Sequence, residues 1–216
     1  MENNYIYLDF ESDSNKHFFL AGYKIGSNFK QTVLSDDLKG LAKALCLETI
    51  NINAFVKNIL NEALTNKRTI VAFTKNEKEI IKQYIPKSDL SKIEYLDIHK
   101  AIKRFINKEP VRKQKFLEYK NQFGNSDGFS LLNAMGFISG ERPINYAPKK
   151  TSKRFKLLEK SLLAKKQEYC KITRHRKSET TKALQHNQHD VESLRYLHDF
   201  LIKNDPKILK KFTTKI

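Results

Sequence analysis

The sequence contains few cysteines, only Cys46 and Cys170 among 216 residues. They lie far apart, and neither has a partner at the spacing of zinc ligands, so we expect no structural zinc. Scarce cysteines without a disulfide pattern are also typical of a reducing compartment, which makes a cytoplasmic protein the default expectation.

Long hydrophobic runs are absent as well. No stretch approaches the roughly 20 apolar residues that a transmembrane helix needs. The chain begins with an acid and two amides and continues with a strand-like pattern, which is not typical of a secretory signal. Internal repeats and low-complexity tracts are also lacking. These absences predict a protein with no membrane partner.

Acidic residues are scarce relative to basic ones. The chain has 24 Asp and Glu against 41 Lys and Arg, a formal net charge of +17. This excess favours a polyanionic partner, most simply nucleic acid, because neutralised phosphates release counterions. A basic proteome or a solubilising surface is the alternative explanation. With 39% hydrophobic residues, the length suffices for one large domain or two small ones.

Strand-like and helix-like patterns alternate in the first half of the chain. Strand patterns occupy residues 5–12, 16–25, 29–34, 68–73 and 93–98. A turn at 26–28 predicts that the first three strands form an antiparallel meander. Helical patterns at 38–47, 54–64, 75–84 and after residue 98 surround the last two strands. We therefore predict an α/β fold with a mixed sheet flanked by helices.

The second half is more polar. Residues 109–152 are loop-prone, and one short helix is expected at 129–135. Residues 149–177 hold twelve Lys and Arg but only two Glu. A final helix is predicted from about 180 to 203, and residues 207–216 are expected to be loosely held. The region 109–177 is thus predicted to be a basic insertion of loops and helix.

Two acids end the first predicted strand. Side chains alternate along a strand, so Asp9 and Glu11 lie on one face, together with Tyr5 and Tyr7. Adjacent carboxylates at the end of a buried strand repel each other and need a cation, a shared proton or solvent. A pair of Mg²⁺ or Mn²⁺ ions would supply the cation, because hard divalent ions prefer oxygen ligands. Two solvated acids are the simpler alternative.

The last predicted helix carries a second polar group. His186 and Asp190 are four residues apart and therefore share a helix face. An apolar stripe that includes Val191 and Leu194 lies beside them and is expected to pack on the sheet. His186 and Asp190 could then lean toward the acidic strand end. A surface ion pair is the alternative for this spacing.

Together these motifs resemble the DEDD superfamily of 3′–5′ exonucleases, which has a ribonuclease H-like fold. The chain looks most similar to the divergent YprB-type branch of that superfamily. The matching segments are Leu8-Asp9-Phe10-Glu11, Phe73-Thr74-Lys75-Asn76-Glu77 and His186-Asn187-x-x-Asp190-Val191-x-x-Leu194. The resemblance covers nearly the whole chain in order, although only these three motifs are sharp. It implies a single ribonuclease H-like nuclease domain over residues 1–216.

The resemblance also implies a metal site and a mechanism. The carboxylates of Asp9, Glu11, Glu77 and Asp190 would hold two Mg²⁺ or Mn²⁺ ions that hydrolyse a phosphodiester bond of DNA or RNA. His186 would act as the general base, since a neutral imidazole suits that role near pH 7. The substrate would be single-stranded nucleic acid or a 3′ end.

Two positions depart from the family pattern. His186 stands where the tyrosine-type branch has tyrosine, and it keeps the tyrosine-type spacing to Asp190. Glu77 stands where most members have Asp, and it is longer. Asp97 is the nearest alternative for the third acid. Glu77 could equally be an acid of a helical first turn, which the helix dipole favours.

The basic segment would follow the phosphate backbone of the substrate. The candidate contacts are Lys149, Lys150, Lys153, Arg154, Lys156, Arg174 and Arg176. Tyr146, Phe155 and Tyr169 could stack on bases, although core packing is the commoner role of such residues. Asn187, His189 and His198 are expected around the site or on the surface. The alternative to nucleic-acid contact is a solvated helix face.

Three other functions fit the same sequence. The chain could be a catalytically inactive nucleic-acid-binding module that keeps the fold. It could be an endonuclease with an open groove instead of a closed 3′-end pocket. It could also be a protein-interaction subunit of a larger nucleic-acid complex, since the insertion and the tail are unusually basic. No motif distinguishes DNA from RNA.

Overall fold

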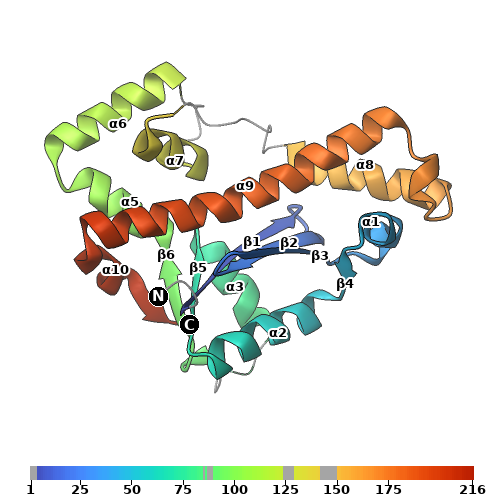
Figure 1. Ribbon diagram of the computed structural model, residues 1–216, viewed down its shortest axis with the longest axis horizontal. Helices are drawn as coiled ribbons and strands as arrows, with labels where there is room; N and C mark the ends of the chain where they lie inside the picture. Colours follow the sequence, from blue (N-terminus) through green and yellow to red (C-terminus); the bar gives the residue numbers. More distant parts are fainter. Residues whose placement is uncertain (1–3, 85, 87–89, 124–128, 142–149) are drawn as a thin grey trace.

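The computed structural model describes residues 4–84, 86, 90–123, 129–141 and 150–216 (Figure 1). The strands are β1 (Tyr5–Ser12), β2 (Phe18–Ile25), β3 (Asn28–Val33), β4 (Glu48–Thr49), β5 (Thr69–Ala72), β6 (Glu94–Asp97) and β7 (Thr213–Lys215). The α-helices are α1 (Lys39–Leu45), α2 (Ile52–Thr65), α3 (Lys75–Gln83), α5 (Ile98–Asn107), α6 (Pro110–Phe123), α7 (Leu131–Ser139), α8 (Thr151–Ala164), α9 (Arg174–Asn204) and α10 (Pro206–Phe212). Two short 3₁₀ helices are η2 (Asp36–Leu38) and η4 (Tyr169–Lys171).

The strands form one mixed sheet in the order β4-β3-β2-β1-β5-β6-β7. The predicted meander is confirmed, because β1, β2 and β3 pair antiparallel and a two-residue turn with Gly26 at φ 57° joins the last two. Strands β5 and β6 then add parallel to β1. Their connections run through helices, as parallel pairing requires. The chain is thus an α/β protein with a mixed, helix-flanked sheet, an arrangement compatible with a ribonuclease H-like fold.

Alternation along β1 separates two hydrophobic layers. Ile6 and Leu8 face the layer that contains α2 and the buried Ile81 of α3. Tyr7 faces the opposite layer, which contains α5 and the apolar stripe of α9, including Val191 and Leu194. Figure 1 shows α9 crossing one face of the sheet, with α2 and α3 on the other. Each fully buried aliphatic side chain contributes about 1.5–3 kcal/mol to these layers.

Side-chain caps begin several of the helices that carry the polar motifs. Thr74 accepts a hydrogen bond from the Asn76 amide at the start of α3. Asp97 caps α5 through the Lys100 amide, and Thr173 caps α9 through the Arg176 amide. Each such cap satisfies an amide that has no partner inside its helix, and is worth about 1 kcal/mol.

Several expectations for the second half were wrong. The supposed loop at 109–152 contains α6, which begins at a proline, and α7, which extends past the expected short helix. Helix α9 begins at Arg174, several residues before the expected start at 180. The tail is not loose, because β7 pairs antiparallel with β6 and Ile216 donates to the Ile93 carbonyl. Contacts with other elements hold these segments in place. Because the segments are polar, their sequences did not indicate those contacts.

One buried histidine joins the sheet to α9. The Tyr7 hydroxyl lies 2.9 Å from Nδ1 of His198, and the Tyr5 ring packs edge-on against the imidazole with centroids 4.3 Å apart. His198 Nε2 is buried and has no hydrogen-bond partner among the residues that the structure describes. Burial alone lowers the pKa of His198 to about 4, so the folded protein holds a neutral imidazole.

We expect His198 to make the fold acid-sensitive. The unfolded chain takes up a proton below pH 6.5, whereas folded His198 resists protonation until about pH 4. The contribution of His198 to the free energy of unfolding should therefore fall by about 2 kcal/mol as the pH is lowered from 7 to 5. Urea unfolding of wild type and His198→Gln at both pH values tests this. The variant should be destabilised more at pH 7 than at pH 5, and an equal difference at both would contradict the prediction.

Candidate active site

The polar face of β1 lies under α9, and one amide connects them. Asn187 Nδ2 donates to Asp9 Oδ2 at 2.7 Å. The Asn187 carbonyl oxygen in turn accepts from Gln31 Nε2 of β3 at 3.0 Å. Asn187 is fully buried, so both ends of its amide are used inside the protein. The first acid is therefore oriented by a side chain that the sequence suggested only as a surrounding or surface residue.

Glycine at position 22 makes this approach possible. Gly22 of β2 pairs directly with Asp9 of β1 and with Gln31 of β3. A Cβ atom at position 22 would lie 2.1 Å from Oδ1 of Asn187, far inside van der Waals contact. The sheet surface is thus flattened where α9 presents Asn187, and no sequence motif marked this position.

His186 lies between two of the predicted acids. Its Nε2 is 3.5 Å from Asp190 Oδ2 and 3.9 Å from Glu11 Oε1. The side chain is only 12% exposed, and burial keeps the pKa of His186 below its usual range. The imidazole is therefore neutral near pH 7. His189 Nδ1 lies 3.7 Å from the other oxygen of Asp190.

The third acid comes from the first turn of α3. Glu77 is buried and accepts a hydrogen bond from the Thr74 hydroxyl at 3.1 Å. Burial is the largest influence on this carboxyl and raises the pKa of Glu77 to about 7. The charge of Glu77 also raises the pKa of Asp9, whereas the charge of Asp97 raises the pKa of Glu77.

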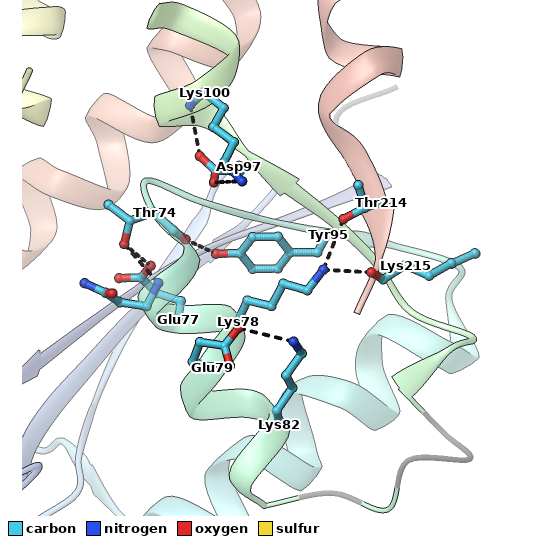
Figure 2. A network of polar contacts seen from close by, with 11 residues as sticks. Thr74, Glu77, Lys78, Glu79, Lys82, Tyr95, Asp97, Lys100, Thr214 and Lys215 are labelled. Carbon is cyan, nitrogen blue, oxygen red and sulfur yellow. Dashed lines mark hydrogen bonds and ion pairs between the residues drawn. The ribbon is translucent and has the colours of Figure 1, made fainter.

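Asp97, the alternative third acid, is engaged elsewhere. Figure 2 shows its carboxylate turned to the start of α5, where Oδ1 accepts from the Lys100 amide at 2.9 Å. Thr74 lies between Asp97 and Glu77 in this view, and its carbonyl accepts a hydrogen bond from the Tyr95 hydroxyl. Asp97 is absent from the groups that shift the pKa of Asp9. Of the two candidates, Glu77 is the one that faces the acidic strand.

Strand β7, at the C-terminal end of the chain, contacts the helix that carries Glu77 (Figure 2). Lys78, the next residue of α3, donates from Nζ to the Lys215 carbonyl at 2.8 Å and lies 3.1 Å from the Thr214 hydroxyl. The same ammonium group lies 5.7 Å from the centre of the Tyr95 ring. Strand β7 and Tyr95 therefore both hold the first turn of α3.

Repulsion and desolvation dominate the acid cluster of Asp9, Glu11, Glu77 and Asp190. Burial, and then the neighbouring acids, raise the pKa of Asp9 and of Glu11 well above the usual range. Asp190 contributes to both shifts. Bringing several carboxylates into one poorly solvated place is unfavourable unless protons or a cation neutralise them.

The carboxylate oxygens of this cluster are hard ligands, which Mg²⁺ and Mn²⁺ prefer. The imidazole of His186 lies beside them. The side chains are nevertheless engaged with protein partners, Asp9 with Asn187 and Glu77 with Thr74. Within the described ranges, no three His, Cys, Asp or Glu side chains are already arranged to hold an ion together. Binding of a metal ion would therefore require these side chains to rearrange.

The predicted phosphate contacts divide into two groups. Arg154 is buried, and its Nε donates to Glu179 Oε2 at 2.9 Å, so its assignment as a surface phosphate contact was wrong. Lys156 is exposed but lies 2.6 Å from Asp13. The remaining candidates within the described residues are exposed or half-buried on α8 and α9 and just before α8: Lys150, Lys153, Arg174 and Arg176. Lys149 and Tyr146 lie outside the described residues.

The predicted stacking residues also differ in position. Phe155 is fully buried and stacks on Phe19, with ring centroids 5.5 Å apart, so it packs in the core and cannot contact a base. Tyr169 is half-buried, and Lys177 Nζ lies 5.4 Å from its ring centre.

A Gly22→Ala substitution should separate Asn187 from Asp9. The added methyl group overpacks the contact, which typically costs about 1–3 kcal/mol. Denaturant unfolding of Gly22→Ala, Asn187→Ala and the double variant measures the effect. Because Asn187→Ala removes the clashing atoms, the double variant should be more stable than the sum of the single effects predicts. Additive effects would show that the two residues do not meet.

The raised pKa of Glu77 predicts destabilisation as the pH rises from acidic to neutral. Folded Glu77 keeps its proton up to about pH 7, whereas the unfolded chain loses it near pH 4.5. The contribution of Glu77 to stability should therefore fall as the pH rises from 4.5 to 7, by at most about 3 kcal/mol. Glu77→Gln should be more stable than wild type at pH 8 in metal-free buffer and lose that advantage at pH 5. A constant difference would contradict this.

Comparisons with known proteins add no family to this geometry. No family model matches the chain, and no curated protein matches its sequence. Within the residues that the structure describes, no helix is both long and apolar enough to span a membrane.

Proposed function

We propose that the chain is a divalent-metal-dependent nuclease of ribonuclease H-like fold, most simply a 3′–5′ exonuclease acting on single-stranded DNA or RNA. One observation carries the proposal. The acids of β1 meet side chains of α9 that are far away in the sequence, since Asn187 donates to Asp9 at 2.7 Å and His186 lies between Glu11 and Asp190. Asp190 also raises the pKa of Asp9 and of Glu11, and Glu77 of α3 raises that of Asp9. Such electrostatic conflict is typical of functional sites.

The acid cluster would hold the ions through Asp9, Glu11, Glu77 and Asp190. When bound, divalent ions lower the pKa of water and stabilise the oxygen that leaves the phosphate. The cluster lies toward the carboxyl end of β1, the central strand of the sheet, and the carboxyl ends of strands commonly carry binding residues.

The protein's own side chains have separate tasks in this proposal. Asn187 holds Asp9 in one orientation through the 2.7 Å hydrogen bond. His186 is neutral and close to both Glu11 and Asp190, so it can accept the proton of an attacking water at Nε2. The resulting imidazolium would be stabilised by the neighbouring carboxylates.

The charge of the surrounding helices supports an anionic substrate. Lys153 of α8 and Arg174 of α9 are exposed, and Lys150 lies just before α8. These side chains could neutralise phosphates without breaking an internal ion pair such as that of Arg154. DNA and RNA would both satisfy this chemistry.

A catalytically inactive nucleic-acid-binding protein is the second candidate. One observation favours it, since the Glu77 carboxyl group already accepts a hydrogen bond from the Thr74 hydroxyl. In that case the acids would persist without capturing metal ions, and the basic helices alone would contact nucleic acid.

Metal binding and cleavage distinguish these candidates. We expect Mn²⁺ to raise the melting temperature of wild type at pH 8, because it neutralises the acid cluster. Asp9→Asn should abolish both this shift and the release of nucleotides from a 3′-labelled single strand. His186→Ala should keep the thermal shift but lose about 10²–10⁴-fold in rate.

Asp199→Asn is the matched control, because Asp199 is a half-exposed acid on the same helix and, among the described residues, forms an ion pair with Arg195 and none with the acid cluster's neighbours. It should behave as wild type in both assays. Cleavage of a circular single strand would replace the exonuclease proposal with an endonuclease. Nucleic-acid binding without any Mn²⁺ shift or cleavage would support the inactive candidate and reject the nuclease.

A further inference from the structure

Three residues on neighbouring strands form a row across the sheet beneath α9. Gly22 of β2 pairs with Asp9 of β1 on one side and with Gln31 of β3 on the other. Residues that pair directly point to the same face of a sheet, so Asp9 and Gln31 flank a position without a side chain. Neighbouring strands are about 4.8 Å apart, which leaves about 10 Å between the backbones of Asp9 and Gln31. An interaction between them therefore needs a group in the middle.

Asn187 of α9 is that group. Its Nδ2 donates to Asp9 Oδ2 at 2.7 Å, and its Oδ1 accepts from Gln31 Nε2 at 3.0 Å. A side-chain amide has one donor end and one acceptor end, which are nearly equal in size. Packing above Gly22 therefore does not by itself determine which end of Asn187 faces Asp9.

Asp9 does not determine that orientation firmly either. A carboxyl group only accepts hydrogen bonds when it is ionised, but it can donate one when it carries a proton, so it can face either end of an amide. Asn187 Nδ2 also lies 3.5 Å from the backbone carbonyl of Asp9, which is at the limit of a hydrogen bond. This second contact adds only a weak preference.

A backbone carbonyl of α9 determines the orientation from the other side. Gln31 Nε2 donates to the Leu184 carbonyl at 2.9 Å. A backbone carbonyl can only accept, so the end of the Gln31 amide that faces α9 is its NH₂ group. The same NH₂ group donates to Asn187, so the oxygen of Asn187 faces Gln31 and its nitrogen faces Asp9. The direction of these hydrogen bonds is thus fixed by a group that cannot reverse.

We propose that Gln31 is a positioning residue for Asp9: anchored on the Leu184 carbonyl, it holds Asn187 with the donor end of its amide toward the acid. This chain of hydrogen bonds does not itself require a nuclease. Its effect on cleavage rests on the proposed function, in which Asp9 is a metal ligand that has to keep one orientation.

Two substitutions of Gln31 test the direction of the hydrogen bonds. Glu has the same size as Gln but an ionised carboxylate offers only acceptors, whereas the Lys ammonium offers only donors. We expect the Asn187 amide to turn over in Gln31→Glu and to keep its orientation in Gln31→Lys. Nuclear Overhauser effects from the Asn187 side-chain amide protons measure this. They should reach the Asp9 β protons in wild type and Gln31→Lys, but not in Gln31→Glu.

The cleavage rate is a second readout. With Mn²⁺ and a 3′-labelled single strand, Gln31→Glu should lower kcat by about 10–100-fold, the usual effect of losing a partner that orients a metal ligand. KM should stay nearly unchanged, because Gln31 is not among the proposed phosphate contacts. Gln31→Lys should retain more of the rate. Charge alone would give the opposite order, since an added carboxylate attracts divalent ions and an added ammonium repels them.

A neutral variant and a control complete the design. Gln31→Met removes the donor without adding a charge that could prevent folding, so the Asn187 amide should populate both orientations. Lys24→Met is the control, because Lys24 of β2 also joins the sheet to α9, through Glu192 Oε1 at 2.6 Å, but lies outside the chain from Leu184 to Asp9. It should lower stability and keep the wild-type Overhauser effects and kcat.

Two results would overturn the proposal. The first is an Asn187 amide that keeps its contact with Asp9 in both Gln31→Glu and Gln31→Met, since Asp9 would then determine the orientation by itself. The second is an equal loss of that contact in Gln31→Lys and Gln31→Glu, which would indicate a packing role alone. Failure of the nuclease proposal has a different signature. Wild type would then cleave nothing, while the expected Overhauser effects in the variants would still support the positioning role of Gln31.

Discussion

The mutual repulsion of carboxylates at the end of β1 is the constraint around which this structure is arranged. Asp9 and Glu11 share a face because strand side chains alternate, and α9 excludes water from that face. One buried amide, that of Asn187, offsets part of this cost by donating to Asp9. Gly22 in turn leaves room for that amide. The protein thus maintains an unfavourable charge arrangement through close packing, which is typical of a site kept for function.

Helix α9 is the element that links these features. It has 31 residues and carries His186, Asn187 and Asp190 within about one turn over the acidic strand end. Farther along, Val191 and Leu194 bury its apolar stripe, and His198 meets Tyr7. The hydrophobic contacts fix the rotation of the helix, and the rotation then determines which polar groups meet β1. Packing and chemistry are therefore coupled through one helix.

Sequence reasoning succeeded where a local pattern determines geometry. The meander follows from period-two alternation and a turn at Gly26, and the shared face of His186 and Asp190 follows from their spacing. It failed where a distant partner decides the outcome. Arg154 looked like a phosphate contact in a basic run, but Glu179 pairs with it in the interior. Helix α6 and strand β7 were missed because their own composition is polar and only packing against α5, α7 and β6 explains them.

The sequence by itself determined the strand and helix periods, the positive charge and the residue types able to bind a divalent cation. Those properties depend on nearest neighbours along the chain, so they can be read without a fold. Only the tertiary structure shows that Asp97 caps α5 and that the charge of Glu77 raises the pKa of Asp9. It also decided that Asn187 orients Asp9. These outcomes depend on contacts between residues far apart in the chain, whose positions no local pattern specifies.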